Sequence, residues 1–151
     1  MTIRKIQGQT IDADTLDGVE LAGLATVPDA TAGNYLETSA DTERAEGGAT
    51  YNKLKEIVLG RAGTYRVKFD LKHSTAAHTA WGAIYKNGAL VGTPQSEAGS
   101  TYVTKSEDIA GLAAGDLLQL YLKVDVEDGL CNAKNLRIYS GNPLVSLVLT
   151  D

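Results

Sequence analysis

The sequence contains one cysteine, one tryptophan and three prolines among its 151 residues. A single thiol, at Cys131, excludes a disulfide within the chain and a zinc site built from several cysteines. Free cysteines are usually buried, so we expect Cys131 to be a small core residue. No stretch approaches the roughly 18 apolar residues of a membrane span. Residues 1–10 lack the apolar segment of a secretory signal. We therefore expect no membrane association and no signal peptide.

Basic residues are too few and too scattered for a polyanion-binding surface. The chain has 14 Lys and Arg against 19 Asp and Glu, which gives a net charge of -5. Binding to nucleic acid depends on basic side chains that neutralise phosphates, so we expect no nucleic-acid partner. The sequence also lacks the Gly-x-Ser-x-Gly string of a nucleophile elbow and the phosphate-binding Gly-x-x-x-x-Gly-Lys-Ser/Thr string. We expect a protein that is not an enzyme.

An acidic cluster near the N-terminus, Asp12, Asp14 and Asp17, raises the question of calcium binding. A calcium loop of the EF-hand type that starts at Asp12 requires Gly at its sixth position and Glu at its twelfth. The chain has Asp17 and Gly23 at these positions, so the loop fails. We expect a capping and turn segment with solvated carboxylates, and a different calcium geometry is the alternative.

The two histidines, His73 and His78, lie five residues apart. A metal site would need a third ligand nearby, and Asp70 is the sole acidic candidate. We therefore expect two exposed loop histidines. Together with the acidic cluster, this predicts neither a cofactor nor a metal site.

Short β-strands separated by turn residues dominate from residue 34 onward. Residues 64–72 alternate between apolar and polar side chains, the period of a half-buried strand. Asn87-Gly88 is a strong hairpin signal because both residues tolerate positive φ. We expect an all-β jelly-roll β-sandwich of about eight to ten strands over residues 34–151. The predicted strands are residues 51–59, 64–72, 79–86, 89–92, 101–109, 117–126, 135–140 and 144–150.

Residues 1–33 lack this regularity and are interpreted as an extended N-terminal arm. A few isolated apolar residues cannot form a core, so the arm must lie on its own domain, on a neighbouring copy or on another protein. A short helical turn after Asp14 or Thr15 is compatible with the spacing of the leucines that follow. We expect attachment to a larger particle through the apolar residues Ile3, Ile6, Ile11, Leu16, Val19 and Leu21.

The last predicted strand is apolar on both faces, with Leu144 and Val148 on one side and Val145, Leu147 and Leu149 on the other. Each strand of a two-sheet sandwich packs one face inward and exposes the other. A strand that is apolar on both faces needs a second cover, because soluble proteins avoid large exposed apolar patches. We expect these residues to form an interface between subunits, and the alternative is that the arm covers them.

Aromatic side chains offer two interpretations. Core packing is the first for Tyr65, Trp81, Tyr85 and Tyr121, which lie on or beside the apolar faces of predicted strands. The alternative is a carbohydrate platform. We expect any glycan or receptor surface at the remaining tyrosines or in the loop of residues 92–99. Those tyrosines are Tyr35, Tyr51, Tyr102 and Tyr139.

Three short motifs over residues 63–151 together resemble the jelly-roll heads of the complement and tumour-necrosis-factor superfamily. They are Gly-Thr-Tyr at residues 63–65, Lys-Asn-Gly at residues 86–88 and Leu-Ala-Ala-Gly-Asp at residues 112–116, which precedes a leucine-rich strand. The resemblance implies a jelly roll of the ten-stranded type. It also implies a trimer whose last strand lies near the three-fold axis.

The arm contains a second resemblance. The string Asp-Ala-Asp-Thr-Leu-Asp-Gly at residues 12–18 looks like an element found in phage tail-fibre and appendage proteins. It implies a structural protein of the virion, whose partners are copies of itself and other capsid or fibre subunits. We expect a homotrimeric head-decoration or fibre module, attached through its N-terminal arm. The alternative is the receptor- or glycan-binding head of a tail fibre.

Overall fold

The computed structural model describes residues 29–126 and 129–141, together with two short strands nearer the N-terminus. These are β1 (Thr15–Leu16) and β2 (Val19–Glu20), which pair antiparallel. The helical turn expected after Asp14 or Thr15 is therefore wrong at these four residues. Across the described ranges every regular element is a strand, and no helix there has the length and hydropathy needed to cross a bilayer.

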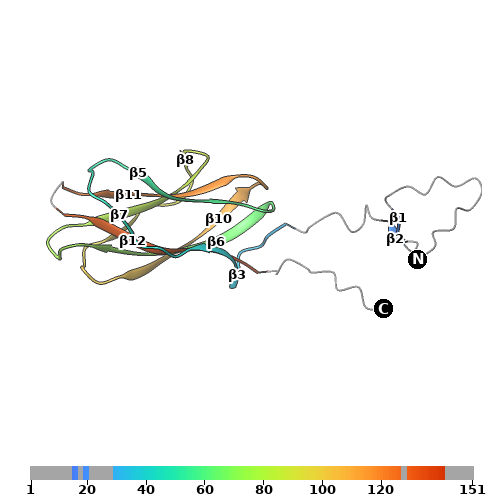
Figure 1. Cartoon of the computed structure of the whole chain (residues 1–151), viewed down its shortest axis with the longest axis horizontal. Coiled ribbons are helices and arrows are strands. Elements are labelled where there is room, and N and C mark those ends of the chain that lie inside the picture. Colours follow the sequence, from blue (N-terminus) through green and yellow to red (C-terminus); the bar gives the residue numbers. More distant parts are fainter. Residues whose placement is uncertain (1–14, 17–18, 21–28, 127–128, 142–151) are drawn as a thin grey trace, which may run out of the picture. The chain divides into compact units, whose positions relative to one another are not determined.

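A β-sandwich unit spans Asp29–Leu144, and its ten strands form two five-stranded antiparallel sheets (Figure 1). The β6–β12 sheet has the order β10 (Val103–Leu112), β6 (Gly63–His73), β12 (Cys131–Ser140) and β3 (Tyr35–Ala40), with β4 (Arg44–Glu46) also paired to β12. The β7–β11 sheet has the order β5 (Asn52–Val58), β11 (Leu117–Val124), β7 (Ala80–Lys86) and β8 (Ala89–Leu90), with β9 (Gln95–Glu97) also paired to β7.

The chain crosses between the sheets at β5, β6, β7, β10, β11 and β12 in turn, which is the connectivity of a jelly roll. The expected fold class is confirmed. The three motifs lie at its turning points. Residues 63–65 open β6, residues 86–88 end β7, and residues 112–116 connect β10 to β11.

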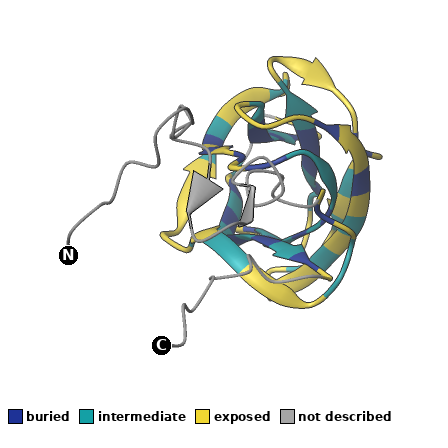
Figure 2. Cartoon of the chain, turned by 90° about the vertical axis from the view of Figure 1, so that its right-hand side faces the viewer, coloured by how far each residue is buried: buried dark blue, intermediate teal, exposed yellow. Residues whose placement is uncertain are grey.

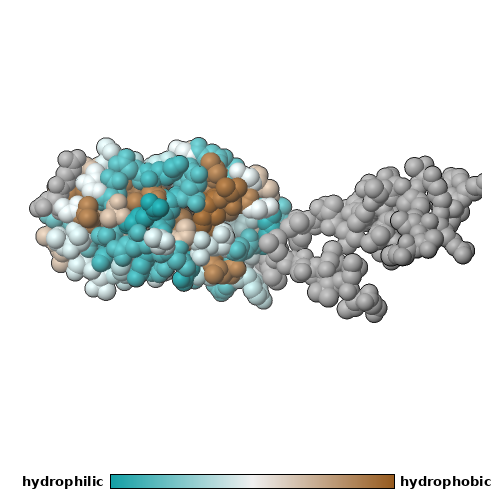
Figure 3. All heavy atoms as spheres, in the orientation of Figure 1, coloured by the Kyte–Doolittle hydropathy of each residue, from teal (hydrophilic) through white to brown (hydrophobic). Residues whose placement is uncertain are grey.

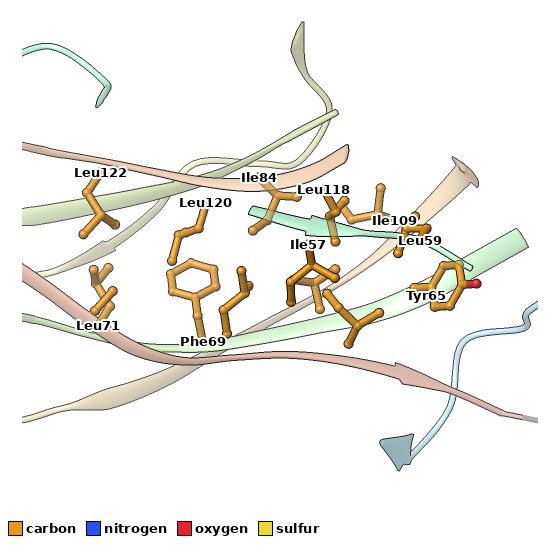
Figure 4. Close-up of a cluster of buried hydrophobic side chains, with 14 of the residues drawn as sticks. Ile57, Leu59, Tyr65, Phe69, Leu71, Ile84, Ile109, Leu118, Leu120 and Leu122 are labelled. Carbon is orange, nitrogen blue, oxygen red and sulfur yellow. The ribbon is translucent and has the colours of Figure 1, made fainter. Parts of the chain in front are cut away.

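The core lies between the two sheets. In β6 every second residue from Tyr65 to Leu71 is buried, as the alternating sequence predicts. Leu118, Leu120 and Leu122 of β11 face them from the other sheet (Figure 4). Viewed end-on, the sheets surround a common interior, and exposed residues lie on the outer surface and in the loops (Figure 2). In the view of Figure 3 the middle of the sandwich surface is mostly hydrophilic.

Charged side chains close the sides of the sandwich. Arg61, whose side chain is 3% exposed, pairs with Glu37 and donates a 3.0 Å hydrogen bond to Ser140 Oγ. At another edge Lys105 Nζ lies 2.9 Å from Glu97 Oε2. Buried charges are tolerated where they are paired, as in both of these contacts.

The first described residues of the sandwich, around Ala30, cross one end of it. Ala30 N donates to Ala62 O and Thr64 N donates to Ala30 O, both at 2.7 Å. A side chain at Gly63 would clash with the backbone of Ala30, so glycine is required for this close approach. Gly141 N also donates to Thr31 O, which places both ends of the sandwich chain side by side.

Several expected contact residues lie outside the described residues. They are the strand predicted at residues 144–150, with Leu144, Val145, Leu147, Val148 and Leu149, and the arm residues Ile3, Ile6, Ile11 and Leu21. Leu16 and Val19 belong to β1 and β2, where they are cross-strand partners. The subunit interface and the attachment surface remain predictions.

Candidate ligand-binding face

Strand β7 presents large aromatic side chains on its outer face. Alternate residues of a strand point to opposite sides, and Ala80 and Ile84 belong to the buried core. Trp81 and Tyr85 therefore point away from the core, and both are half-buried. The strand thus packs small and aliphatic residues inward and carries its rings outward.

Strand β11 repeats this arrangement beside β7. Its core residues alternate with Gln119, Tyr121 and Lys123 on the outer side. The register places Gln119 opposite Tyr85, and Lys123 opposite Trp81. The two central strands of the sheet therefore contribute one continuous outer surface.

The three tyrosine rings on this surface lie close together, and Trp81 joins them through Lys123, whose ammonium lies near the rings of Tyr51 and Trp81. The Tyr85 and Tyr121 rings stack with centroids 4.0 Å apart and planes inclined by 24°. Tyr51, just before β5, brings its ring to 6.2 Å from that of Tyr85. Offset stacking at such distances is favourable for aromatic pairs. We call Tyr51, Trp81, Tyr85 and Tyr121 the aromatic face.

Small and polar residues under the rings are shielded from water. Ala83 is fully buried although it is not part of the core cluster, and it lies opposite Tyr121 in the register. Gln119, opposite Tyr85, is 5% exposed. Burial also raises the pKa of the Tyr51 hydroxyl, with the neighbouring Tyr85 adding to the effect. The rings therefore cover the sheet as a layer.

A hydrogen-bond network fixes the polar groups beside the rings. Gln119 Oε1 accepts from Gly88 N at 2.8 Å, and Gln119 Nε2 donates to Glu56 Oε2 at 2.7 Å. Lys53 Nζ lies 2.9 Å from the same carboxylate oxygen. The bonds from Gln119 and then Lys53 lower the pKa of Glu56, so its carboxylate is ionised at neutral pH. Strands β5 and β11 and the turn at Gly88 thus position the Glu56 carboxylate, a hydrogen-bond acceptor, at the edge of the aromatic face.

Lys123 contributes a cation to the face. Its Nζ lies 5.0 Å from the ring centroid of Tyr51 and 5.8 Å from that of Trp81. Aromatic rings attract an ammonium through their negative faces at such distances. The surface therefore combines stacking rings, an ionised carboxylate and an ammonium.

Core packing, the first interpretation of four aromatic residues, is correct for one of them. Tyr65 is fully buried, and its hydroxyl donates to Arg61 O at 2.8 Å. It is wrong for Trp81, Tyr85 and Tyr121, because the core of β7 and β11 lies on the opposite side of each strand. The alternative interpretation, an aromatic platform, matches where the structure places them.

The other tyrosines are distributed over the β6–β12 side of the sandwich. Tyr35 is 57% exposed in β3. Tyr102 lies beneath the ammonium groups of Lys72 and Lys134, and Tyr139 beneath that of Lys68. These three tyrosines lie away from the aromatic face. Of the four tyrosines that the sequence offers as candidates for a glycan surface, Tyr51 is the one that belongs to this face. Within the loop of residues 92–99, Ser96 of β9 lies opposite Trp81 and borders the face.

The histidine prediction is wrong for His73. Strand β6 extends to this residue, so its side chain continues the inward alternation and is fully buried. Its Nδ1 accepts a 3.0 Å hydrogen bond from Thr75 N. His78 is partly exposed, with its ring 5.6 Å from that of His73. Among the described residues no three His, Cys, Asp or Glu side chains gather as metal ligands.

Cys131 is buried, as predicted. Its thiol contacts Trp81 O at 3.7 Å, and burial raises its pKa to about 12. A thiol in this state is a poor nucleophile, because the thiolate is the reactive form. Cys131 therefore supports the backbone of β7 beneath the aromatic face.

Comparison with known proteins bears on the fold. No family model and no curated protein matches the chain. The sugar-binding C-terminal domain of EclA is similar in structure, with a TM-score of 0.51 and 15% identity over 70% of this chain and 82% of that one. The CBM36-1 domain of a multidomain xylanase from the hindgut metagenome of Trinervitermes trinervoides gives a TM-score of 0.49 and 11% identity over 74% and 90%. The CBM22-1 xylan-binding domain of Paenibacillus barcinonensis Xyn10C gives 0.46 and 12% over 76% and 99%. Because the sequence identities are this low, the structural similarity to the EclA domain supports the β-sandwich fold and nothing more.

Proposed function

We propose that this chain is a glycan-binding module whose ligand lies on the aromatic face. The observation that carries the proposal is a layer of four aromatic side chains on the outside of a sheet whose core lies on its other side. Large aromatic surfaces left accessible to solvent are typical of recognition surfaces. The shared fold of the sugar-binding EclA domain adds support.

The chemistry of the face suits a sugar. A sugar ring has an apolar C–H side, which stacks on an aromatic ring, and a rim of hydroxyl groups that need hydrogen-bond partners. The ring faces of Tyr85 and Tyr121 that are turned away from their mutual stack provide the surface for a sugar. The ionised Glu56 accepts hydroxyl hydrogen bonds at its edge, and charge-assisted bonds of this kind are the stronger ones. We assign this face a binding role and no catalytic one.

The test is a glycan array followed by calorimetric titration of each ligand found. In the double variant Tyr85→Ala, Tyr121→Ala the stacking surface is lost, and we expect affinity to fall at least about tenfold. The matched control is Tyr139→Ala, which removes a tyrosine from the outer face of the other sheet and should leave affinity unchanged. Silence across the array, or equal binding by the double variant, would count against the proposal.

We propose further that the module is part of a phage virion, carried as a homotrimer and attached through its N-terminal arm. Support comes from the Asp-Ala-Asp-Thr-Leu-Asp-Gly string at residues 12–18 and from the doubly apolar sequence that includes Leu144 and Leu149. A multivalent head would strengthen weak single-site binding to a repetitive glycan. The aromatic face would then serve as the receptor-binding surface of a head or fibre.

Light scattering tests the assembly. We expect a trimer for the full chain and a shift toward monomer for Leu147→Asp, because a buried charge at an apolar interface is costly. Val126→Asp, at a position that is 45% exposed in a loop, is the control and should stay trimeric. Deleting residues 1–28 should leave the trimer intact and abolish attachment to particles. A monomeric full chain, or attachment that survives the deletion, would contradict this part of the proposal.

A further inference from the structure

The ammonium of Lys123 is the cationic group that the proposed function leaves without a role. Its strand position directs it outward, and the rings of Tyr51 and Trp81 border it. Aromatic rings attract a cation but accept none of its hydrogen bonds in the manner of an oxygen. Within residues 29–126 and 129–141 no acceptor takes up the three N–H donors of Lys123, so they are available to a ligand that lies on the face.

Lys123 differs from its neighbour Lys53 in its ion pairing. The neighbouring Lys53 is paired with Glu56 at 2.9 Å, so these two charges cancel. Lys123 forms no ion pair with any carboxylate of the described chain. Asp125, two residues beyond Lys123, lies 3.9 Å from the ring nitrogen of His78. Carboxylates farther than about 10 Å from Lys123 are largely screened at 0.1 M salt, so they weaken the attraction of an anion to its ammonium only slightly.

The position of Lys123 suits a ligand that already stacks on the tyrosines. Lys123 follows Tyr121 by two residues of β11, and two residues of a strand span about 7 Å. The ammonium thus lies next to the Tyr85–Tyr121 stack along the same row. A substituent on a sugar stacked there, or on the next sugar of a chain, lies within reach of Nζ.

We infer that the glycan bound by the aromatic face is acidic, and that a sugar-borne anion pairs with Lys123. This inference rests on the proposed function and narrows its ligand class. The anion is a uronic-acid carboxylate or a sulfate ester, which share the same chemistry toward an ammonium. Neutral glycans stack on the same rings without this contact and bind more weakly.

The experiment compares pairs of ligands that differ only at the acidic group. Oligogalacturonate and its methyl ester form one pair, and a sulfated oligosaccharide and its desulfated form make the second. We expect the anionic member of one pair to bind about five- to tenfold more tightly at about 50 mM salt. Raising the salt to about 500 mM should reduce that preference, because screening weakens the ion pair. The pair that shows the preference identifies the anion.

Variants of Lys123 test whether this residue causes the preference for the anionic ligand. Lys123→Gln should remove the preference for the anionic member, whereas Lys123→Arg should retain it. Lys134→Gln is the matched control, since Lys134 Nζ lies 4.2 Å from the Tyr102 ring on the opposite sheet. Thermal unfolding of each variant checks that the fold is retained.

The outcomes separate this inference from the proposed function. If both members of each pair bind with equal affinity, and the Tyr85→Ala, Tyr121→Ala variant loses this binding, the inference is overturned and the proposal of glycan binding stands. A preference for the anion that persists in Lys123→Gln also overturns the assignment. Absence of binding to every glycan, charged or neutral, overturns both.

Discussion

Gly82 and Ala83 determine how side chains pack on the two faces of β7. A Cβ at Gly82 would lie 2.6 Å from Phe69 Cε2, so the missing side chain leaves room for the phenyl ring in the core. Ala83 points the other way and is covered on the outer face, where Tyr121 lies opposite. Small residues here allow large rings to pack against both sides of the strand.

Substitution Gly82→Ala tests this packing. We expect it to lower the free energy of unfolding by about 1–3 kcal/mol, because the added methyl overpacks a filled core. Urea denaturation measures the change. Gly60→Ala is the control, since a Cβ there meets nothing within 4 Å, and it should change stability much less. A Gly82→Ala variant as stable as this control would show that Phe69 moves aside without cost.

The faces of β7 also show what sequence alone could not decide. The alternation correctly separates Trp81 and Tyr85 from Ile84, but the apolar rings make the wrong face look like the core. The true core side holds Ala80 and Gly82 because side chains from β6 fill the space opposite them. Burial depends on the facing sheet, which the local pattern does not contain.

At the scale of elements, the β7–β8 hairpin links the aromatic face to β11. Asn87 and Gly88 have φ values of 51° and 84°, as the two central residues of a type I′ turn require. Asn87 Oδ1 accepts from Leu117 N at 2.8 Å, and Asn87 Nδ2 donates to Asp116 Oδ1 at 2.7 Å. The turn therefore also orders the start of β11.

Replacing Asn87 with alanine should cost about 1–2 kcal/mol. The variant loses two side-chain hydrogen bonds, and alanine tolerates the positive φ less well. Thermal or urea unfolding gives the measurement. Asn52→Ala is the control, because Asn52 is exposed and its side chain makes one 3.2 Å bond to Glu46. A loss no larger than that of the control would show that the hairpin forms without its asparagine.

Turn chemistry and alternation predict most of the longer strands well and several shorter strands at the sheet edges poorly. Strands β6, β7, β10 and β11 all overlap their predicted ranges. The sequence pattern does not indicate β3, β4 and β9, because these edge segments contain more polar residues and little alternation. It also does not indicate that β12 starts at Cys131, because Asn132 and Lys134 alternate with small residues rather than large apolar ones.

At the scale of the whole molecule, connectivity was easier to predict than the site. The strand spacing predicts a sandwich or jelly roll, and the resemblance carried by the three motifs implies the jelly roll; each motif lies where the chain turns. The aromatic face combines Tyr51, Trp81, Tyr85 and Tyr121 from three separate segments. Their proximity follows from the pairing of β7 with β11 and of β11 with β5. No spacing in the sequence indicates that pairing.

The first and last described residues of the sandwich lie side by side, and this placement has a mechanical consequence. Strands β3 and β12 are antiparallel neighbours, with Tyr35 opposite Ser140, and Gly141 bonds to Thr31 just beyond them. Tension applied between the two ends would peel β3 from β12 one hydrogen bond at a time, which is the weak direction for a sheet. A pulling force applied to the domain through its amino-terminal side alone would not load the β3–β12 pairing.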